Sequence, residues 1–293
     1  SSDRNQTLRK IKAKNPFLLA PLEEINDIAF RLLCKKAGAG LTYTGLINPL
    51  TKKEIPLEDK PVLQLFTPKE KSSSGIKEFV KKYDEKVSGW DYNLGCPAKN
   101  ARKQKFGVYL KDLDIIEKVL SEIRSAAGNN KPVSVKIRKT DWNWTSKLIK
   151  IAEKYCDAIA VHPRTKEQGY GGKPDMKFAE KVKSNTKLPV IYSGDVYENN
   201  YKNLLKKFDY LMIGRASIGR PEIFSKLNNK KPPKNITFKD YFKLAKEYKL
   251  PFRQIKFQAM NFTKTKRDAR KLRLEIFKCR NTEQLEKIID KVD

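Results

Sequence analysis

The chain contains the run Val133-Ser134-Val135-Lys136-Ile137-Arg138, in which β-branched residues alternate with polar ones. Residues 146–155 follow with the apolar spacing of an amphipathic helix, and Ala158-Ile159-Ala160-Val161-His162 is a second short apolar run. A strand, a helix and a second strand in this order form the repeating unit of a parallel sheet. Alternation in the first run predicts that its apolar side chains face the outer helices, which turns Lys136 toward the inside.

The same alternation of strand and helix recurs along the chain. Eight short runs occupy about 225 residues, close to the usual length of a (β/α)8 barrel. A doubly wound sheet is the alternative, but such sheets usually carry a glycine-rich dinucleotide turn, and GxGxxG does not occur here. The predicted fold class is therefore α/β, a (β/α)8 TIM barrel. The predicted strands are 17–20, 41–44, 62–66, 89–92, 133–137, 158–162, 190–193 and 211–213, and the predicted helices are 27–37, 74–83, 112–125, 146–155, 175–183 and 199–207.

A break in this pattern divides the chain. Residues 228–235 contain no apolar residue apart from two prolines, which indicates a linker over 228–237. We therefore expect a polar, basic N-terminal segment at 1–14, a barrel over 15–227 and a small C-terminal all-helical domain over 238–293. Helices are predicted in that domain at 238–249, 252–262, 265–279 and 282–292, with Thr282 as the N-cap of the last one.

The charge of the chain is strongly positive. It carries 63 Lys and Arg against 34 Asp and Glu, a formal net charge of +29. A field of that sign attracts polyanions, so nucleic acid is the expected partner, although a lysine-rich proteome would give a similar composition. Residues 253–280 hold ten basic and two acidic residues. An apolar stripe that starts at Ala269 is expected to face the helical bundle, which leaves a basic stripe on the solvent side for phosphate contacts, namely Lys264, Arg267 and Lys271.

The sequence does not indicate a metal site, a disulfide framework or a membrane anchor. The four cysteines are widely spaced without a CxxC pair, and His162 is the only histidine, so clustered metal ligands are lacking. No apolar run approaches the roughly 20 residues that cross a bilayer, and residues 1–14 lack the apolar region of a signal peptide. We expect a soluble cytoplasmic protein in a reducing compartment, with no obligate protein partner.

Polar side chains occur where predicted barrel strands end, which is the rim that carries active sites in this fold. Cys96 follows one strand, where a half-exposed thiol can give or take a proton, although an isolated cysteine is more often an inert apolar residue. Lys136 is expected in the barrel mouth, unless it extends outward at the rim of the sheet. His162 and Arg164 end the next strand, where a lone histidine can be merely structural.

Glycines follow the last two predicted strands, in Ser193-Gly194-Asp195 and Gly214-Arg215. Backbone N–H groups at glycine can approach an anion closely, and the loops after strands 7 and 8 are a common phosphate site in (β/α)8 barrels. We therefore predict a phosphate-bearing cofactor at this place. Flavin mononucleotide (FMN) is the natural candidate, because the chain has no dinucleotide fingerprint.

Together these elements resemble the tRNA-dihydrouridine synthases. The resemblance is collinear over roughly residues 15–225, and its most specific parts are the N-x-G-C-P element and the H-x-R-T element followed by glutamine and tyrosine. The C-terminal segment resembles, less specifically, the helical tRNA-binding domain of that family. The segments that carry the resemblance are Ala20-Pro21-Leu22, Asp27 to Cys34, Gln64-Leu65-Phe66, Asn93 to Ala98, Val135 to Arg138, His162 to Tyr170, Ser193-Gly194-Asp195 and Gly214-Arg215.

The resemblance implies an FMN-dependent enzyme that reduces the C5–C6 double bond of a D-loop uridine in tRNA, with NADPH or NADH as reductant. Cys96 would supply the proton to C5, and Asn93 and Arg164 would help to place the base. The uracil would have to leave its stack to reach such a pocket. The residues that would hold FMN are Pro21, Leu22, Gln64, Lys136, His162, Ser193, Gly194, Asp195, Gly214 and Arg215.

Three places depart from the family pattern. Leu22-Glu23-Glu24 stands where methionine and small residues are usual, residues 105–109 retain one glycine of a glycine-rich turn, and Ser193 replaces an asparagine. The first two affect substrate placement and loop shape more than flavin binding. Two alternatives therefore stay open. One is a flavin barrel that acts on a small pyrimidine, in which the basic bundle would have no purpose, and the other is a non-catalytic RNA-binding relative.

Overall fold

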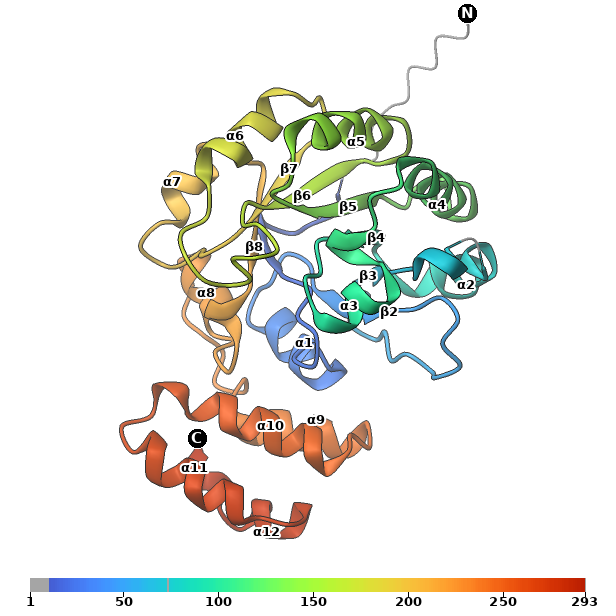
Figure 1. Cartoon of the computed structure of the whole chain (residues 1–293). Helices are drawn as coiled ribbons and strands as arrows, with labels where there is room; N and C mark the ends of the chain where they lie inside the picture. The colour runs from blue at the N-terminus through green and yellow to red at the C-terminus, as the bar shows by residue number, and fades with distance from the viewer. Residues whose placement is uncertain (1–10, 73, 293) are drawn as a thin grey trace, which may run out of the picture.

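The barrel is built from eight parallel strands in one sheet. The computed structural model describes residues 11–72 and 74–292, so most of the predicted segment 1–14 lies outside the described residues. An isolated bridge from Leu18 to Leu41 brings the two edge strands together, which gives a nearly closed barrel (Figure 1). The strand order is β1-β8-β7-β6-β5-β4-β3-β2. The strands are β1 Phe17–Leu19, β2 Tyr43–Ile47, β3 Val62–Leu65, β4 Gly89–Leu94, β5 Val133–Arg138, β6 Ala158–His162, β7 Val190–Ser193 and β8 Tyr210–Ile213.

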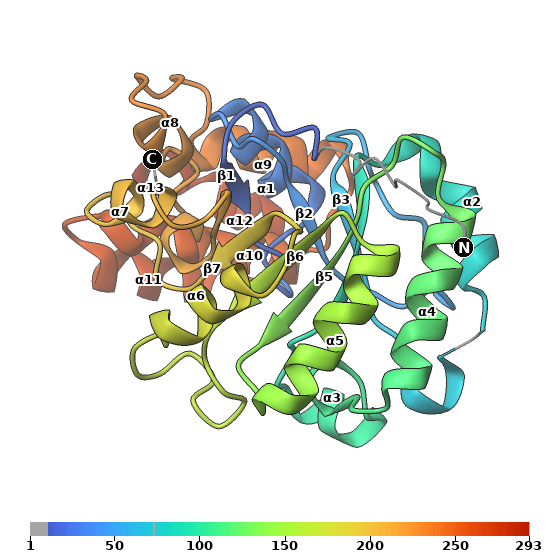
Figure 2. The same ribbon diagram turned by 90° about the horizontal axis from the view of Figure 1, so that it is seen from above.

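Helices surround these strands, as Figure 2 shows from above. Every predicted strand and barrel helix is present, and the (β/α)8 architecture is confirmed. The helix expected at 146–155 begins earlier, at Trp142, because the Asp141 side chain accepts a hydrogen bond from the Trp144 backbone N–H. The strand expected at 41–44 covers 43–47 instead, since Leu41 forms only the bridge to β1. The helices are α1 Ile28–Lys36, α2 Ile76–Tyr83, α3 Lys99–Gln104, α4 Leu113–Ala126, α5 Trp142–Tyr155, α6 Met176–Ser184, α7 Tyr201–Leu205 and α8 Ile223–Leu227.

The interior of the barrel is apolar on one side and polar on the other. Leu18, Ala160, Ile191 and Met212, from β1, β6, β7 and β8, form a buried apolar cluster with Tyr43 of β2. Toward their carboxyl ends, the inward residues of β3, β4 and β5 are polar, and the strand register places them side by side. Because buried polar groups are costly unless they find partners, this side of the barrel is where a functional site is expected. The polar residues are Gln64, Asp91, Asn93, Ser134 and Lys136.

Five helices follow the predicted linker. They are α9 Phe238–Glu247, α10 Phe252–Phe262, α11 Ala269–Lys278, α12 Thr282–Glu286 and α13 Ile289–Val292. The helix predicted at 282–292 is thus two short helices. Its N-cap is Asn281 rather than Thr282, because the Asn281 side chain accepts a hydrogen bond from the Gln284 backbone N–H. α11 starts later than expected, since Thr263–Thr265 form a separate 3-10 turn.

The apolar stripe predicted on α11 is mostly correct. Leu272, Ile276 and Cys279 are buried against the other helices. Leu274 and Phe277 lie on the other side of α11 and are 57% and 69% exposed, so the helix has a second apolar face that the stripe did not include. The basic residues Lys264, Arg267 and Lys271 are exposed, as predicted.

A single carboxylate joins the barrel to these C-terminal helices. One oxygen of Asp27 accepts a hydrogen bond from the Phe30 backbone N–H at 2.9 Å and caps α1. The other oxygen accepts from the Tyr241 hydroxyl at 3.0 Å and from the amides of Gln254 and Gln258 at 2.8 and 3.0 Å. Helix α1 also packs directly on α9 (Figure 1). The loop that starts the barrel is therefore tied to α9 and α10.

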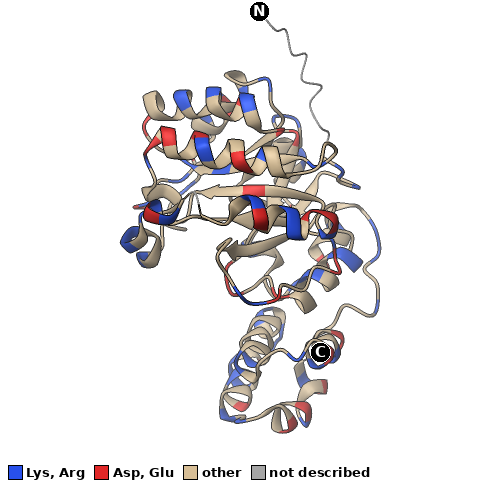
Figure 3. Cartoon of the chain, turned by 90° about the vertical axis from the view of Figure 1, so that its right-hand side faces the viewer, with Lys and Arg blue, Asp and Glu red and all other residues tan. Residues whose placement is uncertain are grey.

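The surface mixes charges of both signs in most places. Figure 3 shows lysine and arginine on the barrel helices and on the C-terminal helices alike, often with aspartate or glutamate nearby. Within residues 11–72 and 74–292 no helix is both long enough and apolar enough to span a bilayer.

Candidate active site

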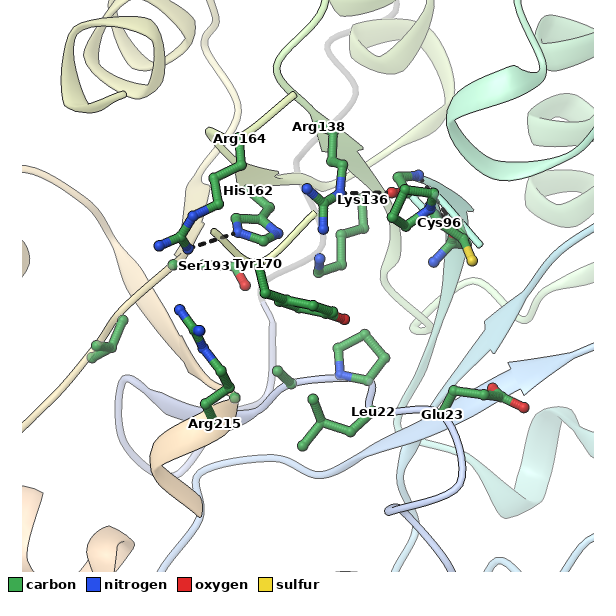
Figure 4. A pocket seen from close by; sticks show the side chains of 18 of the residues that line it. Leu22, Glu23, Cys96, Lys136, Arg138, His162, Arg164, Tyr170, Ser193 and Arg215 are labelled. Carbon is green, nitrogen blue, oxygen red and sulfur yellow. Dashed lines mark hydrogen bonds between the residues drawn. The ribbon is translucent and has the colours of Figure 1, made fainter. Parts of the chain in front are cut away.

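A cavity opens at the carboxyl ends of the strands. Its walls include residues at or just after the ends of all eight strands, so residues far apart in the sequence meet there (Figure 4). All predicted catalytic and cofactor-binding residues line it, together with Asn93 and Arg164. Lys264, Arg267 and Lys271 do not, because they lie on the C-terminal helices. The predicted residues in the cavity wall are Pro21, Leu22, Gln64, Asn93, Cys96, Lys136, His162, Arg164, Ser193, Gly194, Asp195, Gly214 and Arg215.

Cys96 is held by a tight turn after β4. The Asn93 side-chain oxygen accepts hydrogen bonds from the backbone N–H groups of Gly95 and Cys96, at 3.1 and 2.9 Å. Gly107, at φ 59°, packs so closely on this turn that a Cβ there would lie 2.9 Å from the Cys96 nitrogen. The one glycine retained in the segment 105–109 is thus the one that the turn requires.

The Cys96 thiol is protonated at neutral pH. Burial raises its pKa above the ordinary value. The hydrogen bond from the Ala98 backbone is the largest opposing effect, the Glu23 carboxylate raises the pKa further, and Arg138 and Lys136 lower it by smaller amounts. A protonated thiol is suited to donate a proton rather than to attack as a nucleophile. The other three cysteines are buried, so Cys96 is the most accessible thiol of the chain.

Beneath the cavity lies a buried hydrogen-bond network centred on Asp91. Its carboxylate accepts from the Ser134 hydroxyl at 2.6 Å and from the Gln64 amide at 2.7 Å. The Gln64 oxygen in turn accepts from the Asn93 amide at 3.0 Å. Burial raises the pKa of Asp91 to about 6, against the lowering effect of its hydrogen bonds and of Lys136. The network fixes the orientation of both amides that line the cavity.

Lys136 points into the cavity from β5, as its place in the strand predicts. Its ammonium forms no hydrogen bond or ion pair with any residue in the described ranges. Burial lowers its pKa to about 8, and the positive charge of Arg138 acts in the same direction. A buried cation without a protein acceptor favours a ligand that offers an electron-rich oxygen or nitrogen.

His162 is neutral, and its ring accepts a hydrogen bond from Arg164. Burial lowers its pKa to about 2, and the cations Lys136, Arg138, Arg164 and Arg215 add to the effect. Its Nε2 lies 3.2 Å from the Arg164 guanidinium, which can only donate, so Nε2 accepts and Nδ1 carries the proton.

Arg164 is almost fully buried, at 1% exposure, and most of its donors are used inside the protein. Its Nε donates to the Gly171 carbonyl at 3.0 Å, and its Nη2 donates to the Gly172 carbonyl at 2.7 Å and to the Asp195 carboxylate. This side chain therefore holds the loop after β6 in place above the cavity.

The loops after β7 and β8 bring glycine backbone and an arginine to the cavity wall at the place where a phosphate site is predicted. Gly194 has φ 146°, a conformation that only glycine adopts readily, and Asp195 is left-handed at φ 50°. The Asp195 carboxylate binds both Arg164 and Arg215. The guanidinium of Arg215 is half exposed and lines the cavity. Glycine backbone, an arginine and the Lys136 ammonium together fit a phosphorylated flavin.

Among the cavity-wall residues that sequence reasoning did not assign to the site, Arg138 and Tyr170 have the clearest contacts. Arg138 donates to the Gly95 carbonyl at 2.9 Å and to the Gly169 carbonyl at 2.7 Å, which ties the Cys96 turn to the loop after β6. Tyr170, on that loop, lies across the cavity with the guanidinium groups of Arg138 and Arg215 near its ring (Figure 4). Strand alternation could have predicted the position of Arg138, because it lies two residues after Lys136 on β5 and its side chain is on the same face.

Comparison with known proteins agrees with the resemblance seen in the sequence and with the fold. The Dihydrouridine synthase (Dus) family model matches residues 18–293. Similar curated proteins are the tRNA-dihydrouridine synthase B of Vibrio vulnificus, 30% identical over 236 residues, and that of Proteus vulgaris, 28% identical over 236 residues. Each alignment covers 74% of this chain and 72% of the relative.

Solved structures share the barrel at low sequence identity. DHODH of Eimeria tenella is 15% identical with a TM-score of 0.56, and covers 74% of this chain and 80% of its own. The old yellow enzyme homologue of Zymomonas mobilis is 11% identical with a TM-score of 0.54, and covers 78% and 92%. These two likenesses show the fold alone. The family match over nearly the whole chain, with relatives of about 30% identity, shows that this chain belongs to the dihydrouridine synthase family.

Proposed function

We propose that this protein reduces the C5–C6 double bond of a uridine in the D-loop of tRNA, with FMN as cofactor and NADPH or NADH as reductant. Membership of the dihydrouridine synthase family supports the reaction, and the names of the relatives support tRNA as substrate. The observation that carries the proposal is the protonated Cys96 thiol in the wall of a cavity whose other walls offer Lys136 and the glycine-rich anion site.

Different residues would bind the cofactor and supply the proton. Lys136, Gln64, Gly194 and Arg215 would hold FMN, which in its reduced form supplies a hydride to C6 of the uracil. Cys96 holds the proton that C5 takes up, so one hydride and one proton add across the double bond. The remaining cofactor residues proposed here are Pro21, Leu22, His162, Ser193, Asp195 and Gly214.

Asn93 and Arg164 would place the base in different ways. The Asn93 amide has one N–H that the network below does not use, and this group can donate to the uracil. Arg164 acts through the loop that it holds, because its donors already bind carbonyl groups and Asp195. We also infer that residues 238–293 form a helical tRNA-binding domain behind a linker at 228–237. The free state of all four cysteines supports a reducing, cytoplasmic setting.

The test is formation of dihydrouridine, measured by nucleoside mass spectrometry, in modified tRNA that lacks this base after incubation with protein, FMN and NADPH. We expect new dihydrouridine from the parent protein. We expect Cys96→Ala to keep flavin and tRNA binding and to lose turnover by roughly 100-fold or more, the usual contribution of a general acid. Turnover that survives in the variant would remove the thiol from the mechanism. NADPH oxidation without dihydrouridine would instead indicate a small-molecule substrate.

A further inference from the structure

A second concave surface lies on the same rim of the barrel as Cys96. It lies between the loop after β2, the 3-10 helix η1 (Lys69–Lys71) and the end of α3. These segments follow β2, β3 and β4, so they stand at the carboxyl ends of the strands. We call this surface the lysine groove. Its wall includes Lys69, Lys71, Lys103 and Lys105, together with Leu50 and Pro68.

The lysine groove adjoins the turn that carries Cys96. Helix α3 begins at Lys99, directly after that turn, and ends at the groove. The chain then returns through Phe106, whose ring packs 4.2 Å from that of Phe66, to Gly107, which touches Cys96. One short segment of chain thus forms the wall of the groove and the support of the proposed catalytic residue. A strand of nucleic acid that enters the cavity would pass close to this groove.

Most lysines of the groove have no carboxylate partner in the protein. Some lysines elsewhere on the barrel do pair with carboxylates, as Lys154 does with Glu117 and Lys183 with Asp209. In the groove only Lys69 has such a partner, at 3.7 Å from Asp112. Lys71, Lys103 and Lys105 form no ion pair with any residue that the structure describes. One acidic residue, Glu70, is present in the wall against four lysines, so the groove has a local excess of positive charge next to the Cys96 turn.

Lys105 also holds a backbone conformation that disfavours its side chain. It ends α3 at φ 53° and ψ 49°, the left-handed region in which glycine is the usual residue. A lysine here costs stability relative to glycine. Lys60 and Lys249 have the same left-handed conformation, so Lys105 is of interest for its position beside the Cys96 turn and not for its backbone alone.

We propose that the lysine groove binds the phosphate backbone of the RNA strand that flanks the uridine in the cavity. The inference rests on the proposed function and adds a second RNA contact, on the barrel itself. Lysine is a compact cation that suits phosphate contacts without base specificity, and four lysines line the groove. The groove therefore holds the strand while the base is turned into the cavity.

The chain offers a matched pair of variants to test this. Lys105→Gly removes one charge and relieves left-handed strain in the groove. Lys60→Gly makes the same two changes at φ 50°, just before β3, on the opposite rim of the barrel. Both side chains are exposed, and Lys60 likewise forms no ion pair within the described part of the chain. We expect neither variant to lower the melting temperature. We expect only Lys105→Gly to weaken tRNA binding, on the order of fivefold at 0.15 M salt.

The salt dependence of tRNA binding gives a quantitative readout. The combined variant Lys71→Ala, Lys103→Ala and Lys105→Gly should reduce the slope of log affinity against log salt by about 0.9 for each phosphate that the groove no longer neutralises, and Lys60→Gly should leave it unchanged. The parent protein with bound tRNA should also protect Lys71, Lys103 and Lys105, but not Lys60, from acetylation in a mass-spectrometric footprint. Equal slopes and equal acetylation for groove and control lysines would overturn the inference.

This result is separable from the proposed function. Dihydrouridine formation by the parent protein tests the reaction, whereas the slopes and footprints test the groove. A parent that makes dihydrouridine, with groove variants that behave like Lys60→Gly, would refute the groove alone. A parent that binds tRNA through the groove but makes no dihydrouridine would refute the reaction alone.

Discussion

Glu23 places a carboxylate in the same cavity as the Cys96 thiol, at a position where the family usually has a small residue. Its negative charge contributes to the raised pKa of Cys96. Replacing it by glutamine removes this negative charge and should lower the pKa of the thiol. The pH at which half of Cys96 is alkylated should therefore be lower in this variant. The alkaline decline in turnover should also begin at a lower pH, because the thiol loses its proton earlier.

The matched control is Glu24→Gln, because Glu24 is the next residue and does not line the cavity. Alkylation by iodoacetamide followed by mass spectrometry reports on Cys96, since the other three thiols are buried. Identical midpoints for Glu23→Gln and the parent would show that this carboxylate has no influence on the thiol.

Asp91 should affect stability in a pH-dependent way. Its pKa is raised to about 6 in the folded protein, from an ordinary value of 3.8. A carboxyl with a raised pKa stabilises the fold most when it is protonated, and this contribution is lost as the pH rises through about 6. Between pH 7 and pH 5 the parent should therefore gain about 1 kcal/mol in free energy of unfolding relative to Asp91→Asn. Urea unfolding at the two pH values measures the difference, and an equal change in both proteins would contradict the raised pKa.

Individual side chains show where sequence reasoning is strong and where it fails. Lys136 could be placed in the cavity because strand alternation fixes the direction of its side chain. The use of Arg164 could not be foreseen, since its partners are the carbonyl groups of Gly171 and Gly172 in a loop of irregular backbone. Asp91 was missed because it acts by accepting hydrogen bonds from Gln64 and Ser134, and these residues lie on other strands.

At the scale of the elements, the junction between α1, α9 and α10 depends on Asp27. Replacement by alanine removes the cap of α1 and leaves the buried Tyr241 hydroxyl and the Gln258 amide without this acceptor. We expect the free energy of unfolding to fall by roughly 3 kcal/mol, because the N-cap hydrogen bond is lost and buried donors are left without an acceptor. Urea unfolding of the variant and the parent measures this difference.

Asp27→Asn separates the two roles of this residue. Asparagine is as good an N-cap as aspartate, but its amide cannot accept from the three donors on α9 and α10. The variant should keep α1 protected from hydrogen exchange while exchange in α9 and α10 accelerates. Unchanged exchange in these two helices would show that the packing of α1 on α9 is sufficient without the carboxylate.

The barrel elements could be predicted from sequence because each strand and helix has its own hydrophobic period and is flanked by turn residues. The C-terminal helices were located equally well, but their ends were not. The predicted helix at 282–292 breaks into α12 and α13, and the 3-10 turn at Thr263–Thr265 delays the start of α11. Helix ends depend on capping contacts such as that of Asn281, for which Thr282 is an equally plausible residue in the sequence alone.

For the whole molecule, the distribution of charge decides how tRNA is held. Arg267 and Lys271 are exposed on the C-terminal helices, away from the cavity wall. Neutralising both should weaken tRNA binding and reduce the salt slope by about two units, if both meet phosphate. Filter binding over a series of salt concentrations provides the slope. A slope equal to that of the parent would mean that this part of the helical surface does not touch the RNA.

His162 is the only histidine of the chain, and its ring forms part of the cavity wall. The ring lies 3.2 Å from Arg164, and its centroid is 6.1 Å from that of Tyr170. The protein therefore contains a single imidazole, and its ring proton resonances in an NMR spectrum arise from the centre of the candidate site without any isotopic labelling scheme or added probe. Binding of flavin, pyridine nucleotide or RNA in the cavity could therefore be followed by the change in the resonances of this one ring.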